Sequence, residues 1–232
     1  MTDKIDIILL THNDIFNTKG CIENIYHFTS NFNLVILDNY SQDGTVDFLE
    51  NLKKEKDNLI LSLSKENLGC IKGRNIAYGL SNKSEYVIFL DNDQFVTKGW
   101  VKSYFSYIDN GFDIIGFEGW QMKKDFYPQR RSCISEEFNY VGCGGMFLKR
   151  EVIEKIGLFD EDFGMLYFED PDFCWRANEA GYKICWNEHN KIHHKPYKLL
   201  NRERRQHFMR SWDIFKKKYK GYKMPVFKNS KD

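Results

Sequence analysis

Short apolar runs recur along the first ninety residues of the chain, and longer amphipathic segments separate them. Runs rich in Ile, Leu and Val predict buried strands, and the segments between them have the length of helices. The predicted strands are 5–10, 34–38, 59–63 and 86–90. The predicted helices are 19–30, 45–56 and 71–80. Strands that alternate with helices in this way indicate βαβ units and a parallel sheet.

The alternation weakens after Trp100, where polar, aromatic and basic residues are mixed. Strands are still predicted at 113–117 and 183–187, with a short helix at 149–156. The run 140–148 has strand character, but three glycines interrupt it, and such glycines mark a bulge or a close approach of the backbone to a ligand or to its own chain. No element is assigned to the long segment before this run. The fold class is therefore α/β, with a mostly parallel central sheet flanked by helices.

The last part of the chain, 197–232, is a basic and aromatic tail appended to a domain of residues 1–196. Its aromatic residues recur at helical spacing among many Lys and Arg residues: Phe208, Trp212, Phe215, Tyr219 and Tyr222. This pattern predicts an amphipathic helix. The helix would either dock its aromatic stripe on the domain or lie on an anionic membrane. It lacks a recognisable nucleic-acid module, so no nucleic-acid partner is expected.

Composition indicates the size of the domain and the cellular location of the protein, but not its activity. A length of 232 residues fits one α/β domain with an appendage, and a net charge of +1 names no partner. The six cysteines include no Cys-x-x-Cys pair, which argues against a zinc knuckle or a dithiol site. The sequence shows no signal peptide, and it contains no apolar run of about 20 residues that could span a membrane. We expect a cytoplasmic protein with reduced thiols, at most in contact with the inner face of a membrane.

Polar residues follow three of the predicted parallel strands. Asp91 and Asp93 come after the strand 86–90, Asp38 ends the strand 34–38, and the loop 11–14 follows the first strand. The carboxyl ends of parallel strands share one edge of the sheet, where ligands of open α/β sheets bind. Two carboxylates there suit a divalent cation that carries a substrate's phosphates, although Asp-rich turns are also common after strands.

A nucleotide lying across this edge would meet all three loops. Asp38 could accept hydrogen bonds from its base or ribose, as the acidic residue of dinucleotide folds does. No Gly-x-Gly-x-x-Gly fingerprint follows the first strand and no P-loop is present, which disfavours a NAD enzyme or a P-loop NTPase. Lys72 and Arg74, at the start of the predicted helix near Gly69, could attract the phosphates or could belong to a solvated basic face.

A second acidic cluster lies at 167–176. Pro171 fits the first position of a helix, which would make Asp170 its N-cap and place Asp172 in the first turn. Capping explains these two residues but not Glu169. A carboxylate at a helix start can also serve as a general base, and capping would lower its pKa and keep it ionised. Further along, His193 stands in a histidine pair after the strand 183–187, as a metal ligand or as a structural histidine.

With these residues in place, the chain from Ile5 to about His194 resembles the family 2 glycosyltransferases, which have the GT-A fold. The motifs that carry the resemblance are, in chain order, Asp38-Asn39-Tyr40-Ser41-Gln42-Asp43-Gly44-Thr45, Glu66-Asn67-Leu68-Gly69, Gly73-Arg74-Asn75, Asp91-Asn92-Asp93, and Glu169-Asp170 with Asp172, Arg176 and Gly181-Tyr182. An Asp-x-Asp motif alone is a weak signal, but the set in this order is specific.

The resemblance implies a role for each motif. The implied nucleotide-binding residues are Thr11, Asn13, Asp38, Asn39, Ser41, Asn67, Gly69, Gly73, Arg74, Asn75, Asp91 and Asn92. The implied metal ligands are Asp91, Asp93 and His193, for Mn²⁺ or Mg²⁺. Asp170 would be the catalytic base, with Glu169 and Asp172 orienting it or the acceptor. Gly144, Gly145 and Trp175 would lie near the sugar or the acceptor.

The implied reaction is an inverting transfer from a nucleotide-diphospho-sugar to a hydroxyl group, in polysaccharide biosynthesis or a related process. UDP is the commonest nucleotide of the family, and the acceptor could be a glycan, a lipid-linked saccharide or a protein. Two alternatives stay open. A sugar-phosphate nucleotidyltransferase shares the sheet and the metal carboxylates, but usually carries a glycine-rich basic loop after its first strand. A non-catalytic glycan-binding subunit would not need Asp91, Asp93 and Asp170 together.

Overall fold

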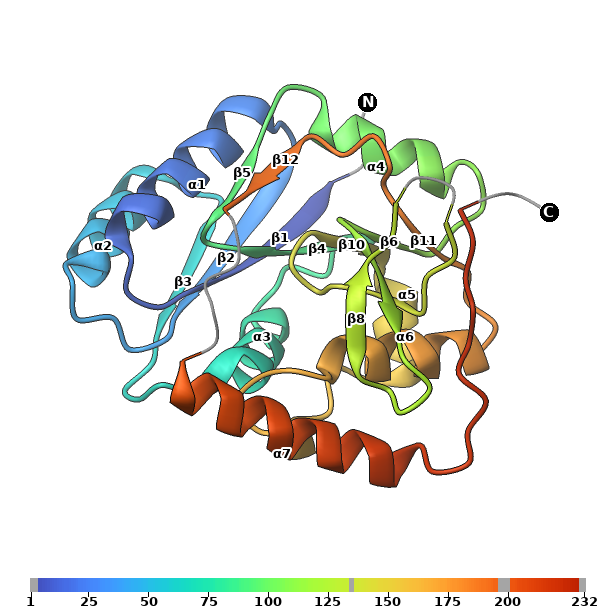
Figure 1. The fold of residues 1–232 in the computed structure, drawn as a ribbon. Coiled ribbons are helices and arrows are strands. Elements are labelled where there is room, and N and C mark those ends of the chain that lie inside the picture. The colour runs from blue at the N-terminus through green and yellow to red at the C-terminus, as the bar shows by residue number, and fades with distance from the viewer. Residues whose placement is uncertain (1–3, 134–135, 196–200, 230–232) are drawn as a thin grey trace.

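A mixed sheet of seven strands forms the centre of the computed structural model, which describes residues 4–133, 136–195 and 201–229 (Figure 1). In spatial order its strands are β11 (Ile184–Trp186), β6 (Ile114–Gly116), β10 (Met146–Lys149), β4 (Tyr86–Asp91), β1 (Ile5–Thr11), β2 (Phe32–Asp38) and β3 (Leu59–Leu63). Strand β10 runs antiparallel to β4 and β6, and the other neighbouring pairs are parallel. The predicted α/β fold with a mostly parallel sheet is confirmed.

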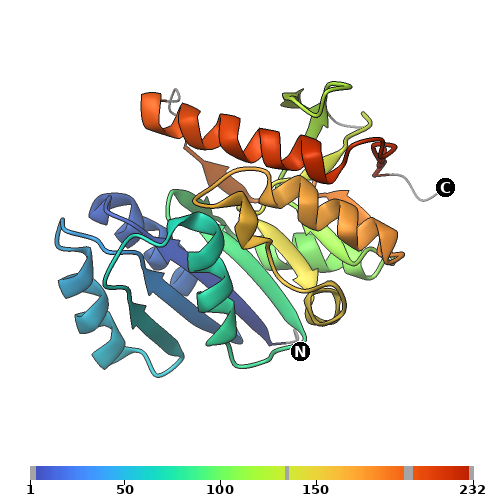
Figure 2. The ribbon, with the colours of Figure 1, turned by 90° about the horizontal axis from the view of Figure 1, so that it is seen from below.

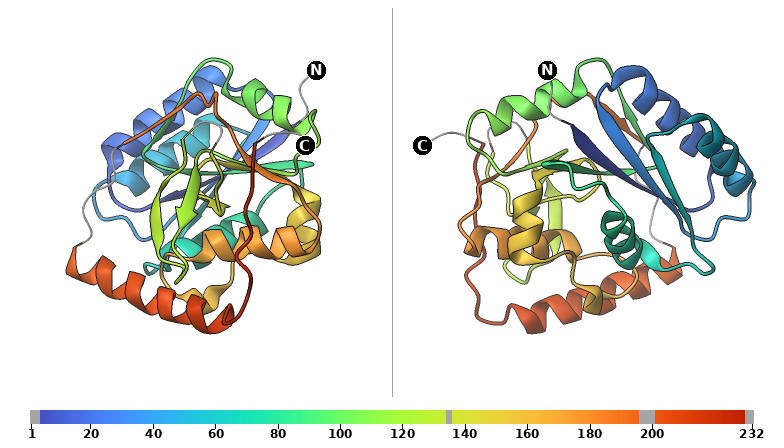
Figure 3. Two further views of the ribbon diagram at one scale, coloured as in Figure 1. Left: turned by 45° about the vertical axis from the view of Figure 1, so that its right-hand side comes forward. Right: turned by 180° about the vertical axis from the view of Figure 1, so that it is seen from behind.

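Helices cover both faces of this sheet because side chains alternate between the faces along each strand. On β1, Ile7 and Leu9 belong to one buried cluster, and Ile8 and Leu10 belong to the other. The first face is covered by α1 (Ile15–Phe28), α2 (Thr45–Glu55) and α4 (Trp100–Ile108). The second face is covered by α3 (Gly69–Gly79), α5 (Arg150–Ile156), α6 (Glu169–Glu179) and α7 (Arg202–Lys218) (Figures 2 and 3).

The register of the sheet brings the strand ends of the sequence motifs together. Thr11 on β1 pairs with Asp38 on β2, and Leu10 pairs with Asp91 on β4. The carboxyl ends of three neighbouring strands therefore form one continuous edge. The polar loops that follow β1, β2 and β4 all begin there.

The structure also contains two small sheets. One joins β5 (Gln94–Val96) to β12 (Ile192–His194), and the other joins β8 (Pro128–Arg131), β7 (Gly119–Met122) and β9 (Tyr140–Val141). None of β5, β7, β8 and β12 was predicted from the sequence, because each is held by pairing with a distant or irregular segment rather than by a periodic apolar pattern. The predicted strand 140–148 is divided into β9 and β10 by the turn that holds its glycines.

The aromatic stripe of α7 faces the domain. Phe215 is fully buried, and its ring lies 4.8 Å from the ring of Trp175 on α6, centroid to centroid. Ser211 donates from its hydroxyl to the backbone oxygen of Phe163, which belongs to the short 3-10 helix η1 (Glu161–Phe163). The helix lies alongside α6 in both turned views (Figures 2 and 3). Among the described residues, no helix is both long and apolar enough to cross a membrane.

Candidate functional site

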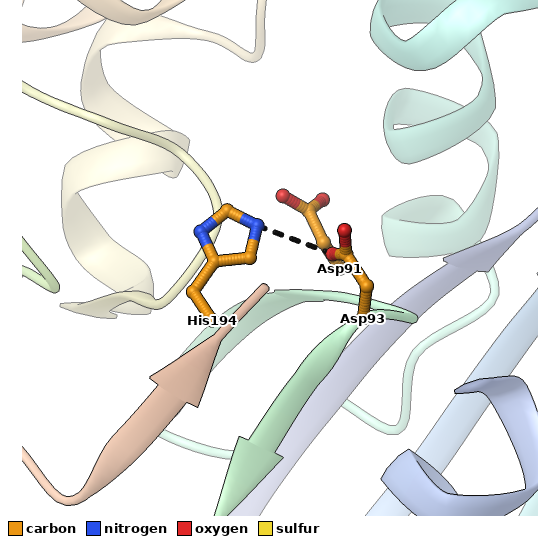
Figure 4. A group of neighbouring side chains, drawn as sticks. All are labelled: Asp91, Asp93 and His194. Atoms are coloured by element: carbon orange, nitrogen blue, oxygen red, sulfur yellow. Dashed lines mark ion pairs between the residues drawn. The ribbon is translucent and has the colours of Figure 1, made fainter. Parts of the chain in front are cut away.

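Three potential metal ligands converge at the end of β4. Asp91 is the last residue of β4, Asp93 follows in the turn to β5, and His194 is the last residue of β12 (Figure 4). One ligand atom from each lies within 4.8 Å of the others, and Nε2 of His194 is 3.2 Å from Oδ1 of Asp93. The antiparallel pairing of β12 with β5, in which His194 is opposite Gln94, holds the imidazole there.

The histidine in this group is His194 and not the predicted His193. Successive residues of a strand point to opposite faces, so only one member of a histidine pair on β12 can face the carboxylates. His194 does so, whereas His193 pairs with Phe95 and is exposed. The prediction of His193 as a metal ligand is therefore corrected by one residue.

The group fits a divalent cation by its chemistry. Two carboxylates and one imidazole give a mixed oxygen and nitrogen donor set, which suits Mn²⁺ among the hard divalent ions. Burial raises the pKa of Asp93, but the hydrogen bond and charge of His194 outweigh it, and the net pKa is lowered. Burial lowers the pKa of His194, but its bond to Asp93 outweighs that effect and raises it. The hydrogen bond between His194 and Asp93 thus holds two of the three potential ligands together where a cation could bind.

Arg74 connects this group to the acidic cluster at 169–172. Its guanidinium lies 2.6 Å from Oδ1 of Asp91 and 3.2 Å from Oε1 of Glu169. Arg74 and Glu169 are both buried, and Oε2 of Glu169 has no hydrogen-bond partner among the described residues. The pair of contacts joins α3, β4 and the start of α6. One arginine offsets only part of the negative charge here, so the site remains attractive to cations.

Asp170 is fixed beside the same edge by the backbone. Its Oδ1 accepts a hydrogen bond of 2.9 Å from the amide of Cys143, in the turn between β9 and β10. The next residue of that turn, Gly144, has to be glycine, because a Cβ there would lie 2.2 Å from Oδ2 of Asp91. Gly144 thereby lets the turn approach Asp91 closely, and it brings Asp170 and Asp91 to either side of one short segment. The predicted location of Gly144 and Gly145 near the sugar or the acceptor stays a prediction.

The helix α6 begins two residues earlier than predicted, and this changes the electrostatics of Asp170. The N-cap is Phe168, and Asp170 lies inside the first turn. Burial and, next, the charge of Glu169 raise the pKa of Asp170 well above its usual value, although Arg74 opposes them. The pKa of Glu169 is also raised by burial. The predicted lowering of the pKa of Asp170 by capping is wrong.

The loops after β1 and β2 are joined by buried hydrogen bonds. Asp38 accepts from the hydroxyl of Thr11 at 3.0 Å and from the amide of Ser41 at 2.8 Å. The hydroxyl of Ser41 in turn accepts from the amide of Asn13 at 2.8 Å. Asp38 is 1% exposed. Its carboxylate therefore shapes the two loops, and a direct contact of Asp38 with a base or ribose stays a prediction.

A second set of amide contacts ties in the segment before α3. The Nδ2 atom of Asn39 donates to Oδ1 of Asn67 at 3.0 Å and to the backbone oxygen of Gly69 at 3.2 Å. On the other side, Nδ2 of Asn92 donates to the hydroxyl of Thr18 at 2.9 Å. Asn39 thus connects the loop after β2 to the segment before α3, and Asn92 connects the loop after β4 to α1.

Two of the predicted nucleotide-binding residues instead pack α3 against its neighbours. A Cβ on Gly73 would lie 2.7 Å from a methyl group of Leu10, so this glycine lets α3 approach β1. The side chain of Asn75 donates to the backbone oxygen of Phe159 at 2.8 Å and accepts from its amide at 3.2 Å. Both residues are turned toward protein, and their predicted role as direct nucleotide contacts is not supported by this geometry.

Asp172 and Trp175 also lie away from the site. Asp172 is fully buried and accepts from the hydroxyl of Tyr219, the C-cap of α7, at 2.9 Å and from Nε of Arg176 at 2.8 Å. Trp175 is fully buried, and its indole donates to the backbone oxygen of Asn139 at 2.9 Å. The predicted catalytic role of Asp172 and the predicted sugar contact of Trp175 are therefore corrected: both residues anchor α6 to the body of the protein.

Sequence reasoning missed two residues of the site. His194 could have been chosen over His193 if β12 and its register had been recognised. Gln94 is fully buried, and its side-chain oxygen accepts from the amide of Asp91 at 3.0 Å, which fixes the end of β4. Its position three residues after Asp91 was the available signal.

A comparison with known families agrees with this geometry. The model of the family described as Glycosyl transferase family 2 matches residues 6–157, more than half of the chain. The chain belongs to glycosyl transferase family 2. A curated relative, Glycosyltransferase AglE of Haloferax volcanii, is 24% identical over 196 residues, which cover 78% of this chain. The chain spans 63% of the length of that relative.

Solved structures of glycosyltransferases share the fold. GalNAc-T7, solved with UDP, GalNAc and Mn²⁺, superposes with a TM-score of 0.76 at 12% identity, over 95% of this chain and 49% of that one. S. aureus TarS in complex with UDP-GlcNAc gives 0.62 at 20% identity, over 84% and 59% of the two chains. The mannosyltransferase PcManGT of Pyrobaculum calidifontis, solved with GDP-Man and Mn²⁺, gives 0.62 at 17%, over 80% and 55%. This member of family 2 therefore has the GT-A fold.

Proposed function

We propose that the chain is a metal-dependent, inverting glycosyltransferase that moves a sugar from a UDP-sugar to a hydroxyl group. The observation that carries the proposal is the convergence of Asp91, Asp93 and His194 beside Asp170, across the turn that contains Gly144. The acceptor is a glycan, a lipid-linked saccharide or a protein side chain, and the enzyme works in the cytoplasm. Structural neighbours solved with UDP, UDP-GlcNAc and GDP-Man support a nucleotide-diphospho-sugar as the donor.

The proposed transfer requires a cation beside the leaving diphosphate and a general base beside the acceptor hydroxyl. Departure of a nucleoside diphosphate develops negative charge, and Mn²⁺ held by Asp91, Asp93 and His194 would offset that charge. Arg74, paired with Asp91 at 2.6 Å, keeps this carboxylate oriented when no cation is present. The loops that begin at Thr11 and Asp38 line the same edge and would receive the nucleotide.

Asp170 is the proposed general base. It lies on the opposite side of the turn at Cys143 and Gly144 from Asp91, partly exposed and held by one backbone amide. A raised pKa brings a carboxylate closer to the working pH, where a general base is most effective. Removal of the acceptor proton by Asp170 as the acceptor oxygen attacks the anomeric carbon gives a single displacement with inversion. Glu169, paired with Arg74, fits an orienting role.

Product analysis tests the proposal. The full chain is incubated with Mn²⁺ and, in turn, UDP-GlcNAc, UDP-GalNAc, UDP-Glc and GDP-Man, with water or a mixture of saccharides as acceptor. We expect release of a nucleoside diphosphate that depends on Mn²⁺, and a product with inverted anomeric configuration by NMR. In a parallel incubation with UTP and a sugar 1-phosphate, release of pyrophosphate would instead indicate a nucleotidyltransferase. The absence of turnover with every donor, together with an absence of metal-dependent nucleotide binding, would contradict the proposal.

A further inference from the structure

The backbone that leads into α6 has an unusual conformation. Tyr167 and Phe168, the two residues before Glu169, have φ angles of 76° and 71°, in the left-handed region that residues with side chains seldom adopt. Two such residues in succession persist only where the surrounding structure holds them. The conformation fixes the direction in which Glu169 and Asp170 leave the turn.

Contacts from α3 hold the first part of this turn. The amide of Cys70 donates to the backbone oxygen of Met165 at 2.7 Å. The side chain of Asn75 donates to the backbone oxygen of Phe159 at 2.8 Å. These bonds hold the segment 159–165 against α3.

The opposite side is held by α7. The hydroxyl of Ser211 lies 2.8 Å from the backbone oxygen of Phe163 and 3.0 Å from that of Leu166, and it shares its hydrogen between them. Ser211 is 1% exposed, so water does not replace these bonds. The serine thereby spans the turn immediately before the two left-handed residues.

Two residues at the end of α7, Lys218 and the C-cap Tyr219, reach the first turn of α6. The hydroxyl of Tyr219 donates to Oδ1 of Asp172 at 2.9 Å, and Nζ of Lys218 lies 2.6 Å from the same oxygen and 2.6 Å from Oδ2 of Asp160. Asp172 stands two residues after Asp170 in the same helical turn. Because a helix turn is stiff, an anchor at Asp172 also sets the rotation of the helix about its axis at Asp170.

We propose that α7 is a positioning element of the active site, in which Ser211 and Tyr219 hold the turn and the first helical turn that present Asp170. The inference rests on the proposed role of Asp170 as the base. Ser211 and Tyr219 touch no reacting atom, and they act through Asp172 and the backbone of the turn. The tail helix is then part of the catalytic apparatus although none of its side chains belongs to the site.

Two variants of the full chain test the inference, Ser211→Ala and Tyr219→Phe, each of which removes one hydroxyl from a buried position. The first readout is hydrogen exchange of backbone amides with UDP and Mn²⁺ present. We expect faster exchange at 163–172 and unchanged exchange at 32–45. The second readout is turnover of the donor that the wild type uses. We expect kcat to fall about tenfold or more while the KM for donor stays within about twofold, because misplacement of a catalytic group slows the chemical step without removing donor contacts.

Matched variants on the same helix separate positioning from general damage. Lys217 is exposed, so Lys217→Gln should leave both readouts unchanged. Lys218→Gln should lower kcat, and Lys218→Arg, which keeps the cation between Asp160 and Asp172, should restore most of it. Wild-type kcat in both hydroxyl variants, or unchanged exchange at 163–172, would overturn the inference. A wild type that turns over no donor would contradict the proposed function instead, and the exchange data would still decide whether α7 holds the turn.

Discussion

Two pairs with the spacing Asp-x-Asp, Asp91 with Asp93 and Asp170 with Asp172, have different roles in this protein. Asp91 ends a strand, Asp93 follows in the next turn, and both converge with His194. Asp170 and Asp172 stand in the first turn of a helix, where Asp170 meets the amide of Cys143 and Asp172 meets Tyr219 on the far side. Residues two apart share a face in extended backbone, but they point about 200° apart around a helix.

The comparison shows that a motif's chemistry depends on the backbone that carries it. The end of β4 and the turn that follows it deliver Asp91 and Asp93 to one place, which suits a metal site. A helix start can deliver only part of an acidic run to the same site. The remaining carboxylate, Asp172, became an anchor for α7, where Arg176 and Lys218 neutralise it.

The matched pair Asp170→Asn and Asp172→Asn tests this division most strongly. Asp170→Asn should keep donor binding and lose about 10²–10⁴-fold in turnover, the usual contribution of a general base. Asp172→Asn should unfold more easily by about 1–3 kcal/mol, because it weakens hydrogen bonds to Arg176 and Lys218. Turnover and urea denaturation measure the two effects. If Asp172→Asn abolished turnover at full stability, or Asp170→Asn turned over at the wild-type rate, the division would be wrong.

Trp175 belongs to the anchoring side of the comparison and not to the sugar side. Trp175→Ala should lower the free energy of unfolding by about 3–5 kcal/mol, since a large buried side chain is removed from its packing against Phe215. Trp175→Phe should cost less and leave the KM for acceptor unchanged. Thermal denaturation and acceptor kinetics check both statements. A large rise in the acceptor KM of Trp175→Phe without loss of stability would return this residue to the acceptor site.

Variants of His193 and His194 test which histidine of β12 belongs to the metal site at the end of β4. His194→Ala should weaken Mn²⁺ binding at least about tenfold, because even loss of a residue that only supports a metal ligand has an effect of that size. His193→Ala should leave Mn²⁺ binding unchanged, since this residue is exposed on the other face of β12. Calorimetric titration with Mn²⁺ in the presence of UDP measures both. Equal losses in the two variants would mean that the register of β12 is wrong.

The smallest expected effect is on the pH dependence of thermal stability, through the ion pair of Asp160 with Lys218 at the end of α7. Burial raises the pKa of Asp160, but its hydrogen bond and ion pair with Lys218 outweigh it, and the net pKa lies below the usual 3.8. A lowered pKa adds stability above the unfolded value, and this stability is lost as the pH falls through the folded value. The Tm of Asp160→Asn should therefore lie below that of the wild type at pH 7, and the difference should shrink below about pH 4. A difference that grew in acid would contradict this sign.

The sequence could predict those parts of the site that lie at the ends of strands with a clear apolar pattern. The strands that carry Thr11, Asp38 and Asp91 are continuous apolar runs, and parallel topology alone aligns their ends. The helix start at 169 was harder. Pro171 suggested a cap at Asp170, but two residues in the left-handed region allowed the helix to begin at Glu169. That conformation depends on α3 and α7, which lie far away in the sequence.

The same limit explains the histidine and the tail. Choosing His194 needs the pairing of β12 with β5, a contact between segments nearly one hundred residues apart. The burial of Trp175 needs α7, and nothing within 167–176 indicates which of its residues the tail covers. The residue types were enough to predict the chemistry of the site. Tertiary contacts determine which of two neighbouring residues, such as His193 and His194, lies in the site.

The central claim is that Asp91, Asp93 and His194 hold a divalent ion through which a nucleoside diphosphate binds. The most direct measurement is the thermal stability of the wild type and of Asp93→Ala with UDP, GDP, CDP and dTDP, each with and without Mn²⁺. At about 100 times its dissociation constant, a bound ligand stabilises the folded chain by about 2.7 kcal/mol. We predict that UDP stabilises the wild type only with Mn²⁺, and that Asp93→Ala loses this shift. Equal stabilisation of both proteins, or none by any diphosphate with Mn²⁺, would contradict the claim.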